Sequence, residues 1–214
     1  MITYKHFIFN RLAVNAFVVY DETKNAVIID GAVSKEAELQ KITDFVEQES
    51  LKINYIISTH GHFDHVCGNA DLKAKYNAPI LMNEADNDWV KAAKSVAGKY
   101  GIKIEDAPFP DKYINEGDII KFGNSELEIF QVPGHSVGSV IIYSKSIKTV
   151  FSGDTLFENS IGRTDFPGGD YDTLISSIKS KIFNLPVETI VFPGHGNSTN
   201  IEVELGNNPY FKKP

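Results

Sequence analysis

The sequence predicts an α/β (α+β) protein in which two β-sheets pack face to face and helices cover both outer faces. Two runs of strand-like segments are each followed by helical segments, so strands and helices partly alternate along the 214 residues. Hydrophobic residues make up 42% and charged residues 23%, an ordinary globular mixture that excludes collagen-like and mostly disordered classes. We therefore expect a single domain over residues 1–214.

The N-terminal part of the chain predicts the first sheet and its helices. Short segments rich in β-branched and aromatic residues predict strands at 4–9, 15–20, 26–30, 53–58 and 78–82. Apolar residues at helical spacing predict helices at 34–49, 69–76 and 84–97. Ser34 is the expected N-cap of the first helix, and Gly98 with Gly101 is expected to end the third.

The C-terminal part predicts the second sheet. Residues 102–116 contain Pro108 and Pro110 and are expected to form an irregular connection. Strands are expected at 119–122, 125–131, 139–143, 149–152 and 189–192, and a helix at 171–182.

Histidines after predicted strands carry the functional signal. The densest run, Thr59-His-Gly-His-Phe-Asp-His65, directly follows a buried strand. Alternate residues of an extended segment face the same way, so His60, His62 and Asp64 are expected to converge, whereas His65 points elsewhere until the chain turns. Imidazole and carboxylate ligands suit Zn²⁺, Fe²⁺ or Mn²⁺, and the absence of cysteine from this run argues against a thiolate site.

Three further ligand-type residues, His135, Asp154 and His195, each stand beside a glycine at the end of a predicted strand. Together with the first run they make five histidines and two aspartates, a set that fits two metal ions sharing one carboxylate. The sixth histidine, His6, is expected to be a half-buried strand residue far from this site.

These motifs resemble the metallo-β-lactamase superfamily over essentially the whole chain. The resemblance implies a four-layer αβ/βα sandwich with the site at one edge of the two sheets. It implies two divalent metal ions, first of all Zn²⁺, with Fe or Mn as alternatives. Its motifs assign His60, His62 and His135 to the first ion. They assign Asp64, His65 and His195 to the second ion, and Asp154 as the bridge.

The loop from Ser160 to Asp170 narrows the match, because it resembles that of short bacterial glyoxalase II-like (hydroxyacylglutathione hydrolase-like) metallohydrolases. Asn197 stands where those proteins usually carry proline. Longer glyoxalases II add a C-terminal helical glutathione-binding domain, and we expect none here, since the chain ends soon after His195. The resemblance implies hydrolysis of a thioester such as S-lactoylglutathione by a metal-bridging hydroxide, with Asp64 as the catalytic residue that orients it.

The alternative function is that of a mononuclear iron persulfide dioxygenase of the same superfamily. Such enzymes share a loop like Gly162–Phe166, so this loop does not discriminate between the two functions. The continuation Pro167-Gly168-Gly169 favours the hydrolase group.

The expected partner is a small-molecule thioester. A net charge of −7 disfavours nucleic acid, and no apolar run is long enough to cross a membrane. With no signal peptide and a single cysteine, Cys67, we expect a cytoplasmic protein. The sequence leaves the oligomeric state open.

Two residues near these motifs, Asp30 and Arg163, have more than one possible role. Asp30 either orients a ligand histidine or is an ordinary turn carboxylate. Arg163 is expected to pair with a nearby aspartate of its loop rather than to bind a substrate carboxylate. Trp89 is expected to pack as part of an ordinary helix face, and Cys67 as a small packed residue.

Overall fold

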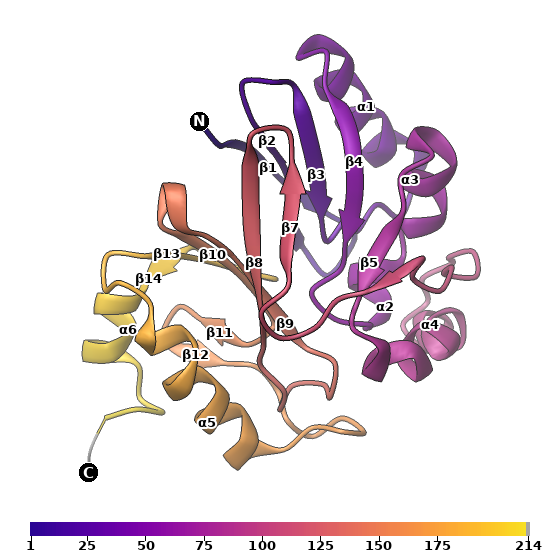
Figure 1. Ribbon diagram of the computed structural model, residues 1–214. Coiled ribbons are helices and arrows are strands. Elements are labelled where there is room, and N and C mark those ends of the chain that lie inside the picture. Colours follow the sequence, from indigo (N-terminus) through magenta and orange to yellow (C-terminus); the bar gives the residue numbers. More distant parts are fainter. Residues whose placement is uncertain (213–214) are drawn as a thin grey trace.

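The computed structural model describes residues 1–212 and contains two six-stranded mixed sheets that face each other (Figure 1). The first sheet has the order β1 (Thr3–Phe9), β2 (Val14–Tyr20), β3 (Asn25–Ile29), β4 (Lys52–Ile57), β5 (Ile80–Met82) and β6 (Lys112–Tyr113). The second has the order β14 (Thr199–Asn200), β13 (Ile190–Pro193), β10 (Thr149–Gly153), β9 (Val140–Ser144), β8 (Ser125–Gln131) and β7 (Ile119–Phe122). A small hairpin, β11 (Leu156–Phe157) and β12 (Ser160–Ile161), follows β10.

Helices cover the outer faces of both sheets, as Figure 1 shows. The helices are α1 (Glu36–Gln48), α2 (Phe63–Val66), α3 (Asn69–Tyr76), α4 (Asn87–Lys99), α5 (Tyr171–Ser180) and α6 (Ile201–Asn207). Short 3₁₀ turns lie at Glu84–Asp86, Lys145–Ile147 and Ile182–Asn184. Helices α1 and α3 pack on the first sheet, and α5 and α6 on the second.

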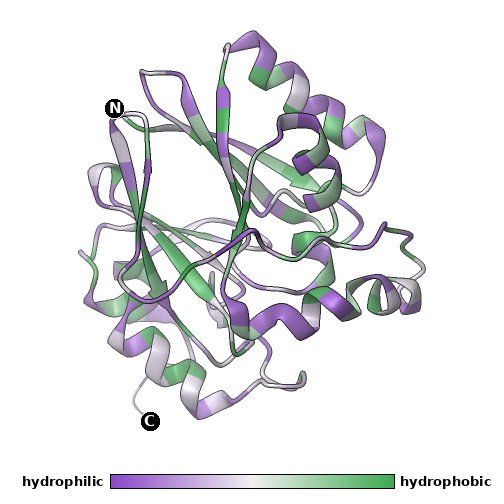
Figure 2. Cartoon of the chain, turned by 45° about the vertical axis from the view of Figure 1, so that its right-hand side comes forward, coloured by the Kyte–Doolittle hydropathy of each residue, from purple (hydrophilic) through white to green (hydrophobic). Residues whose placement is uncertain are grey.

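The side-chain alternation of the strands builds three stacked cores. On β2, Phe17 and Val19 face the second sheet and meet Phe151 there, whereas Val18 faces Ile42 of α1. The second sheet likewise packs its outer face on α5 and α6. Figure 2 shows hydrophobic residues along the strands, and helices on which hydrophobic and hydrophilic residues alternate. The predicted sandwich of four layers is therefore confirmed.

Most predicted elements are present, and some have the predicted bounds, such as Asn69–Tyr76 and Ser125–Gln131. The N-cap prediction for Ser34 is wrong. Lys35 takes the N-cap position of α1, and the Ser34 backbone N–H and hydroxyl both donate to Glu38 instead. The predicted helix at 84–97 begins as a 3₁₀ turn, and α4 continues through Gly98 to Lys99.

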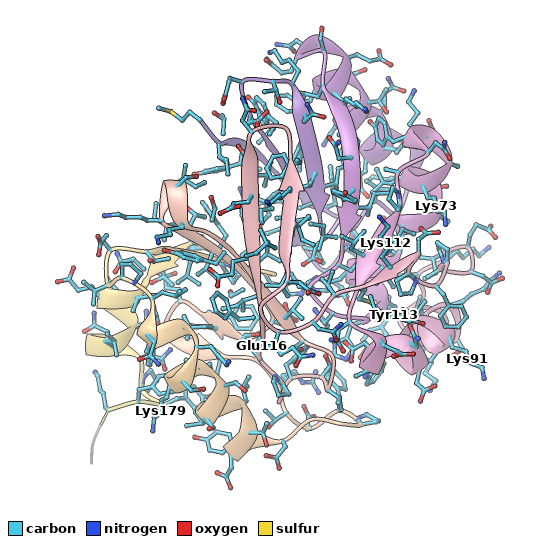
Figure 3. The ribbon with its side chains drawn as sticks, in the orientation of Figure 1. Lys73, Lys91, Lys112, Tyr113, Glu116 and Lys179 are labelled. Carbon is cyan, nitrogen blue, oxygen red and sulfur yellow. The ribbon has the colours of Figure 1, made fainter. Side chains whose placement is uncertain are left out.

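The surface away from the sheets is charged. Lys73, Lys91 and Lys179 extend outward from α3, α4 and α5 (Figure 3). Within residues 1–212, no helix is both long enough and apolar enough to cross a membrane.

Candidate metal centre

The seven predicted ligand residues come together at one edge of the sandwich, where several strands end. His60 follows β4, and Asp64 and His65 lie in the short helix α2, for which His62 is the N-cap residue. The remaining three follow strands of the second sheet: His135 after β8, Asp154 after β10 and His195 after β13. Strands therefore deliver ligand-type side chains from both sheets to one place.

Within this cluster the ligand atoms form three overlapping groups, each with all its atoms within 4.8 Å of one another. The groups are His60–His62–His135, His60–His65–Asp154 and Asp64–His65–His195. The Asp154 carboxylate lies between the outer two groups, because its Oδ2 is 3.6 Å from Nε2 of His135 and 3.6 Å from Nε2 of His195.

Two sequence expectations need correction at this point. Asp64 does not join His60 and His62, because the chain turns into α2 at Phe63 and carries Asp64 toward His65 and His195. The extended-chain argument therefore holds only as far as His62.

His6 belongs to none of the groups found among residues 1–212, and it is exposed rather than half-buried. Its ring stacks on Phe17 at 4.9 Å. Its Nε2 hydrogen-bonds the side chain of Asn15, which in turn donates to the backbone carbonyls of Pro193 and Gly196. His6 is thus linked to the loop of His195 without being part of the cluster.

Backbone carbonyls orient two of the imidazoles. Nδ1 of His135 donates to the carbonyl of Arg163, and Nδ1 of His195 donates to the carbonyl of Leu12, both at 2.8 Å. Because a carbonyl only accepts, each Nδ1 carries the hydrogen, and the lone pair of each neutral ring lies on Nε2, which faces the cluster. In each of these two rings, the nitrogen that carries the hydrogen is therefore determined by a backbone carbonyl that is distant in sequence.

Asp30 orients a third ring, which decides between its two predicted roles. Its buried carboxylate accepts hydrogen bonds from Nδ1 of His65 at 3.0 Å and from the Thr59 backbone N–H and hydroxyl. The Thr59 oxygen lies 3.0 Å from Nδ1 of His60. Because that hydroxyl already donates to Asp30, it accepts from His60. One carboxylate thus fixes two rings.

The buried donor atoms of the cluster fit metal ions. Nε2 of His60, Nε2 of His62 and Oδ1 of Asp154 are buried without a hydrogen-bond partner among residues 1–212. Nδ1 of His62 faces Nε2 of His135 at 2.9 Å, and Nε2 of His65 faces Nε2 of His195 at 3.3 Å. Such facing nitrogens require a proton or a cation between them, and a nitrogen and oxygen donor set of this size fits two divalent ions.

The electrostatics of the cluster also suit cations. Burial lowers the pKa of His60 well below its ordinary value and that of His62 to about 3, so both rings are neutral. Burial alone would lower the pKa of His65 and of His195, but nearby carboxylates outweigh it and raise both. Burial would raise the pKa of Asp154, but the surrounding histidines, His65 first, hold it well below its ordinary value. A negative charge therefore stays at the centre of the cluster.

Asp86 is a structural support that the sequence did not reveal. It is fully buried and accepts hydrogen bonds from the backbone N–H of Gly61, the backbone N–H of Gly138 and the hydroxyl of Ser136. It thereby ties the loop of His60 and His62 to the residues just after His135.

The prediction for Trp89 is wrong. Its ring lies 4.3 Å from that of His62, edge to face, so it borders the cluster instead of packing as an ordinary helix residue. The expected pairing of Arg163 is confirmed, because its guanidinium donates to both carboxylate oxygens of Asp165 at 2.9 and 2.8 Å. Cys67 is buried as expected, and burial raises the pKa of its thiol to about 12.

Gly194 shows why a glycine precedes His195. A Cβ atom at this position would lie 2.2 Å from Oδ1 of Asp154 and 2.7 Å from Cε1 of His65. Any side chain here would displace two members of the cluster, so the close approach of the backbone requires glycine.

Residues 9–195 match the family described as the metallo-beta-lactamase superfamily. The chain belongs to this superfamily. Superfamily members bind divalent metals, and the histidine–aspartate cluster is the matching feature of this chain. The sandwich with its ligands at one edge of the sheets is therefore a family property that this chain shares.

Individual relatives cover nearly all of the chain. "Hydroxyacylglutathione hydrolase GloC" of Haemophilus influenzae is 38% identical over 198 residues, which is 92% of each chain. The solved structure of BLEG-1 B3 metallo-beta-lactamase has a TM-score of 0.89 and 33% identity and covers 99% of this chain and 100% of its own. TTHA1623, solved in a di-iron-bound form, has a TM-score of 0.86 and 34% identity, with coverage of 96% and 99%. ETHE1 from Myxococcus xanthus, at 24% identity and a TM-score of 0.75, shares the fold over 97% of this chain and 83% of its own.

Proposed function

We propose that this protein is a binuclear metal-dependent hydrolase of thioesters such as S-lactoylglutathione. The observation that carries the proposal is the second ligand group. Besides His60, His62 and His135, the fold preassembles Asp64, His65 and His195, with Asp154 between the two groups. A site with one metal ion at His60, His62 and His135 would give no reason for Asp64, His65 and His195 to converge. The similarity to a relative named hydroxyacylglutathione hydrolase supports the thioester as substrate.

The residues of the site have separate tasks in this proposal. His60, His62 and His135 would hold one ion, Asp64, His65 and His195 the other, and Asp154 both. When bound, such an ion pair supplies an activated water at neutral pH and polarises a carbonyl oxygen. Asp64 would accept a hydrogen bond from the attacking water and orient it toward the carbonyl carbon. Asp30 and the carbonyls of Leu12 and Arg163 would keep the rings in place.

We propose Zn²⁺ as the resident metal, because a site of imidazoles and carboxylates with no thiolate suits it. Iron and manganese accept the same donor set, and one relative was solved with two irons. We further propose that the protein works in the cytoplasm, in keeping with its single buried cysteine.

Assays of metal-loaded protein against matched substrates test the proposal. Thiol release from S-lactoylglutathione is expected, and it should stop when a chelator removes the metal. Oxygen uptake and sulfite formation from glutathione persulfide, followed in parallel, test the dioxygenase alternative, and a β-lactam tests a lactamase activity. Asp64→Asn should abolish thiol release, whereas the exposed Asp172→Asn on α5 should not. Sulfite formation from glutathione persulfide in a protein that does not hydrolyse S-lactoylglutathione would overturn the proposal.

A further inference from the structure

An apolar cavity opens directly onto the ligand cluster. Its volume is 420 Å³, within the range of small-molecule sites. Besides members of the cluster, its walls are mostly hydrophobic side chains, which are Leu12, Phe63, Trp89, Val96, Tyr100, Phe157, Ile161 and Phe166. They come from segments far apart in the sequence, so the fold builds this apolar surface at the site.

Aromatic rings of the cavity reach the first ligand group itself. The ring of Trp89 lies 4.3 Å from that of His62, and the ring of Phe166 lies 5.2 Å from His62 and 6.3 Å from His135. All three contacts are edge to face. One of the two groups attached to a carbonyl placed at His62 and His135 can therefore lie against Trp89 and Phe166.

The cavity offers no unpaired cation to an anionic group. Among its lining residues, all of which are described in the structure, Arg163 is the one lysine or arginine side chain. Its guanidinium is already paired with both oxygens of Asp165 and lies 4.3 Å above the ring of Phe166. Away from the ligand cluster, a carboxylate inside the cavity would find no free lysine or arginine to compensate its charge, and burying such a charge is costly.

We propose that the preferred substrates are thioesters whose acyl group is apolar and larger than lactoyl, such as an arylalkanoyl group. This inference rests on the proposed thioester hydrolysis and specifies its substrate class. The acyl group ends the substrate molecule and can be enclosed against Trp89 and Phe166. A carrier thiol such as glutathione is long and charged, so it extends toward solvent past the exposed Tyr100 and Arg163.

A series of glutathione thioesters tests the acyl preference with the leaving thiol held constant. The acyl groups are acetyl, lactoyl and 3-phenylpropanoyl, and each kcat/KM is divided by the rate of alkaline hydrolysis to remove intrinsic reactivity. We expect the corrected kcat/KM of the phenylpropanoyl ester to exceed that of the lactoyl ester at least tenfold, a difference of about 1.4 kcal/mol. Equal or lower values for the phenylpropanoyl ester, with lactoyl ester turnover intact, would overturn this inference but not the hydrolase function.

Binding can be measured without catalysis, because Trp89 is the only tryptophan of the chain and lines the cavity. Tryptophan fluorescence is followed while S-(3-phenylpropyl)glutathione or S-methylglutathione, which are thioethers and cannot be hydrolysed, is added. We expect the phenylpropyl compound to bind at least tenfold more tightly. Equal affinity would overturn the inference. Tighter phenylpropyl binding in a protein that hydrolyses no thioester would support the apolar preference and overturn the proposed function.

Variants locate the preference in the cavity. Phe166→Ala keeps the fluorescent reporter, and Trp89→Phe keeps an aromatic ring should Trp89→Ala fold poorly. Phe166→Ala and Trp89→Ala should each lower the ratio of phenylpropanoyl to lactoyl turnover by about tenfold. Phe109→Ala removes an exposed ring outside the cavity and should leave the ratio unchanged. An unchanged ratio in both cavity variants would overturn the inference.

Discussion

Nδ1 of His65 donates to Oδ2 of Asp30 at 3.0 Å, and both side chains are buried. Asp30 follows β3 of the first sheet, and its carboxylate also accepts from Thr59, the residue before His60. Asp30, at the end of β3, thus orients His60 and His65, which follow the neighbouring strand β4.

Replacing Asp30 should weaken the second metal subsite. In Asp30→Asn one carboxylate oxygen becomes an NH₂ group, which donates and cannot accept. The hydrogen bond that this oxygen accepts from His65 or Thr59 is therefore lost. We expect metal affinity at this subsite to fall about 10- to 100-fold. Competition with a chromogenic chelator measures this, with Asp172→Asn as the control. Wild-type affinity in Asp30→Asn would show that His65 needs no such support.

The two aspartates of the cluster should differ in their effects. Asp154→Ala should lose both metals and all activity, because Asp154 lies between the two ligand groups. Asp64→Asn should weaken only the second ion, because His60, His62 and His135 are unchanged. It should lose rate severely, because the attacking water loses its orienting carboxylate. Elemental analysis beside thiol release measures both effects. Equal metal loss in the two variants would make Asp64 simply a ligand.

Asp86 should matter for both stability and the first subsite. In Asp86→Asn an NH₂ group replaces one of the accepting oxygens. In this fully buried position it faces an N–H of Gly61 or Gly138, or the hydroxyl of Ser136, and a hydrogen bond is lost. We expect a loss of about 1–3 kcal/mol in unfolding free energy, together with weaker binding of the first metal. Urea unfolding and metal titration measure the two effects. Ser136→Ala removes one of the three donors and should lower the unfolding free energy less than Asp86→Asn does. A larger loss in Ser136→Ala would argue against this role of Asp86.

Metal removal should destabilise the fold. Without a cation, the buried Nε2 atoms of His60 and His62 and one oxygen of Asp154 have no hydrogen-bond partner in the described part of the chain. A metal bound only by the folded state adds about 4 kcal/mol at a free concentration a thousandfold above Kd. Thermal unfolding should therefore shift to lower temperature with a chelator and recover when Zn²⁺ is added in excess. A Tm that is the same with and without chelator would indicate that these residues bind no metal.

Asp21 should contribute to acid sensitivity away from the site. Burial would raise the pKa of its carboxyl, but hydrogen bonds from Thr23 and Asn124 outweigh it and lower the pKa. A lowered folded-state pKa contributes stability that is present above the ordinary value of about 3.9 and is lost as pH falls through the lowered value. Asp21→Asn should therefore flatten the pH dependence of unfolding below about pH 4. An unchanged slope in urea unfolding across this range would contradict the assignment.

Elements with strong local patterns were predictable from the sequence. The strands Ile119–Phe122 and Ser125–Gln131 flank a Gly123-Asn124 turn, and local residues alone determine them. The two-residue strand β6 was not predictable, because it exists only where Leu81 and Met82 pair with Lys112 and Tyr113. Strands this short depend on their neighbour rather than on their own side chains.

The residues of the site likewise include some that were predictable from the sequence and some that were not. Its ligand-type residues were predictable, because each stands beside other ligand residues or a glycine at a strand end. Asp86 and Trp89 lie in or beside α4 and carry no such mark. Their roles depend on contacts with Gly138 and His62, which are distant in sequence and meet them only in the folded chain. The sequence alone therefore predicted the cluster of ligand-type residues and offered Asp30 as a possible support, but it missed the support from Asp86 and the apolar wall.

Titration of metal-free protein with Zn²⁺, followed by thiol release from S-lactoylglutathione, tests the central claim most directly. Two preassembled ligand groups predict that activity rises to a plateau at two ions per chain, with little activity at one. A plateau at one ion per chain, or activity that requires a single iron and consumes oxygen, would contradict it.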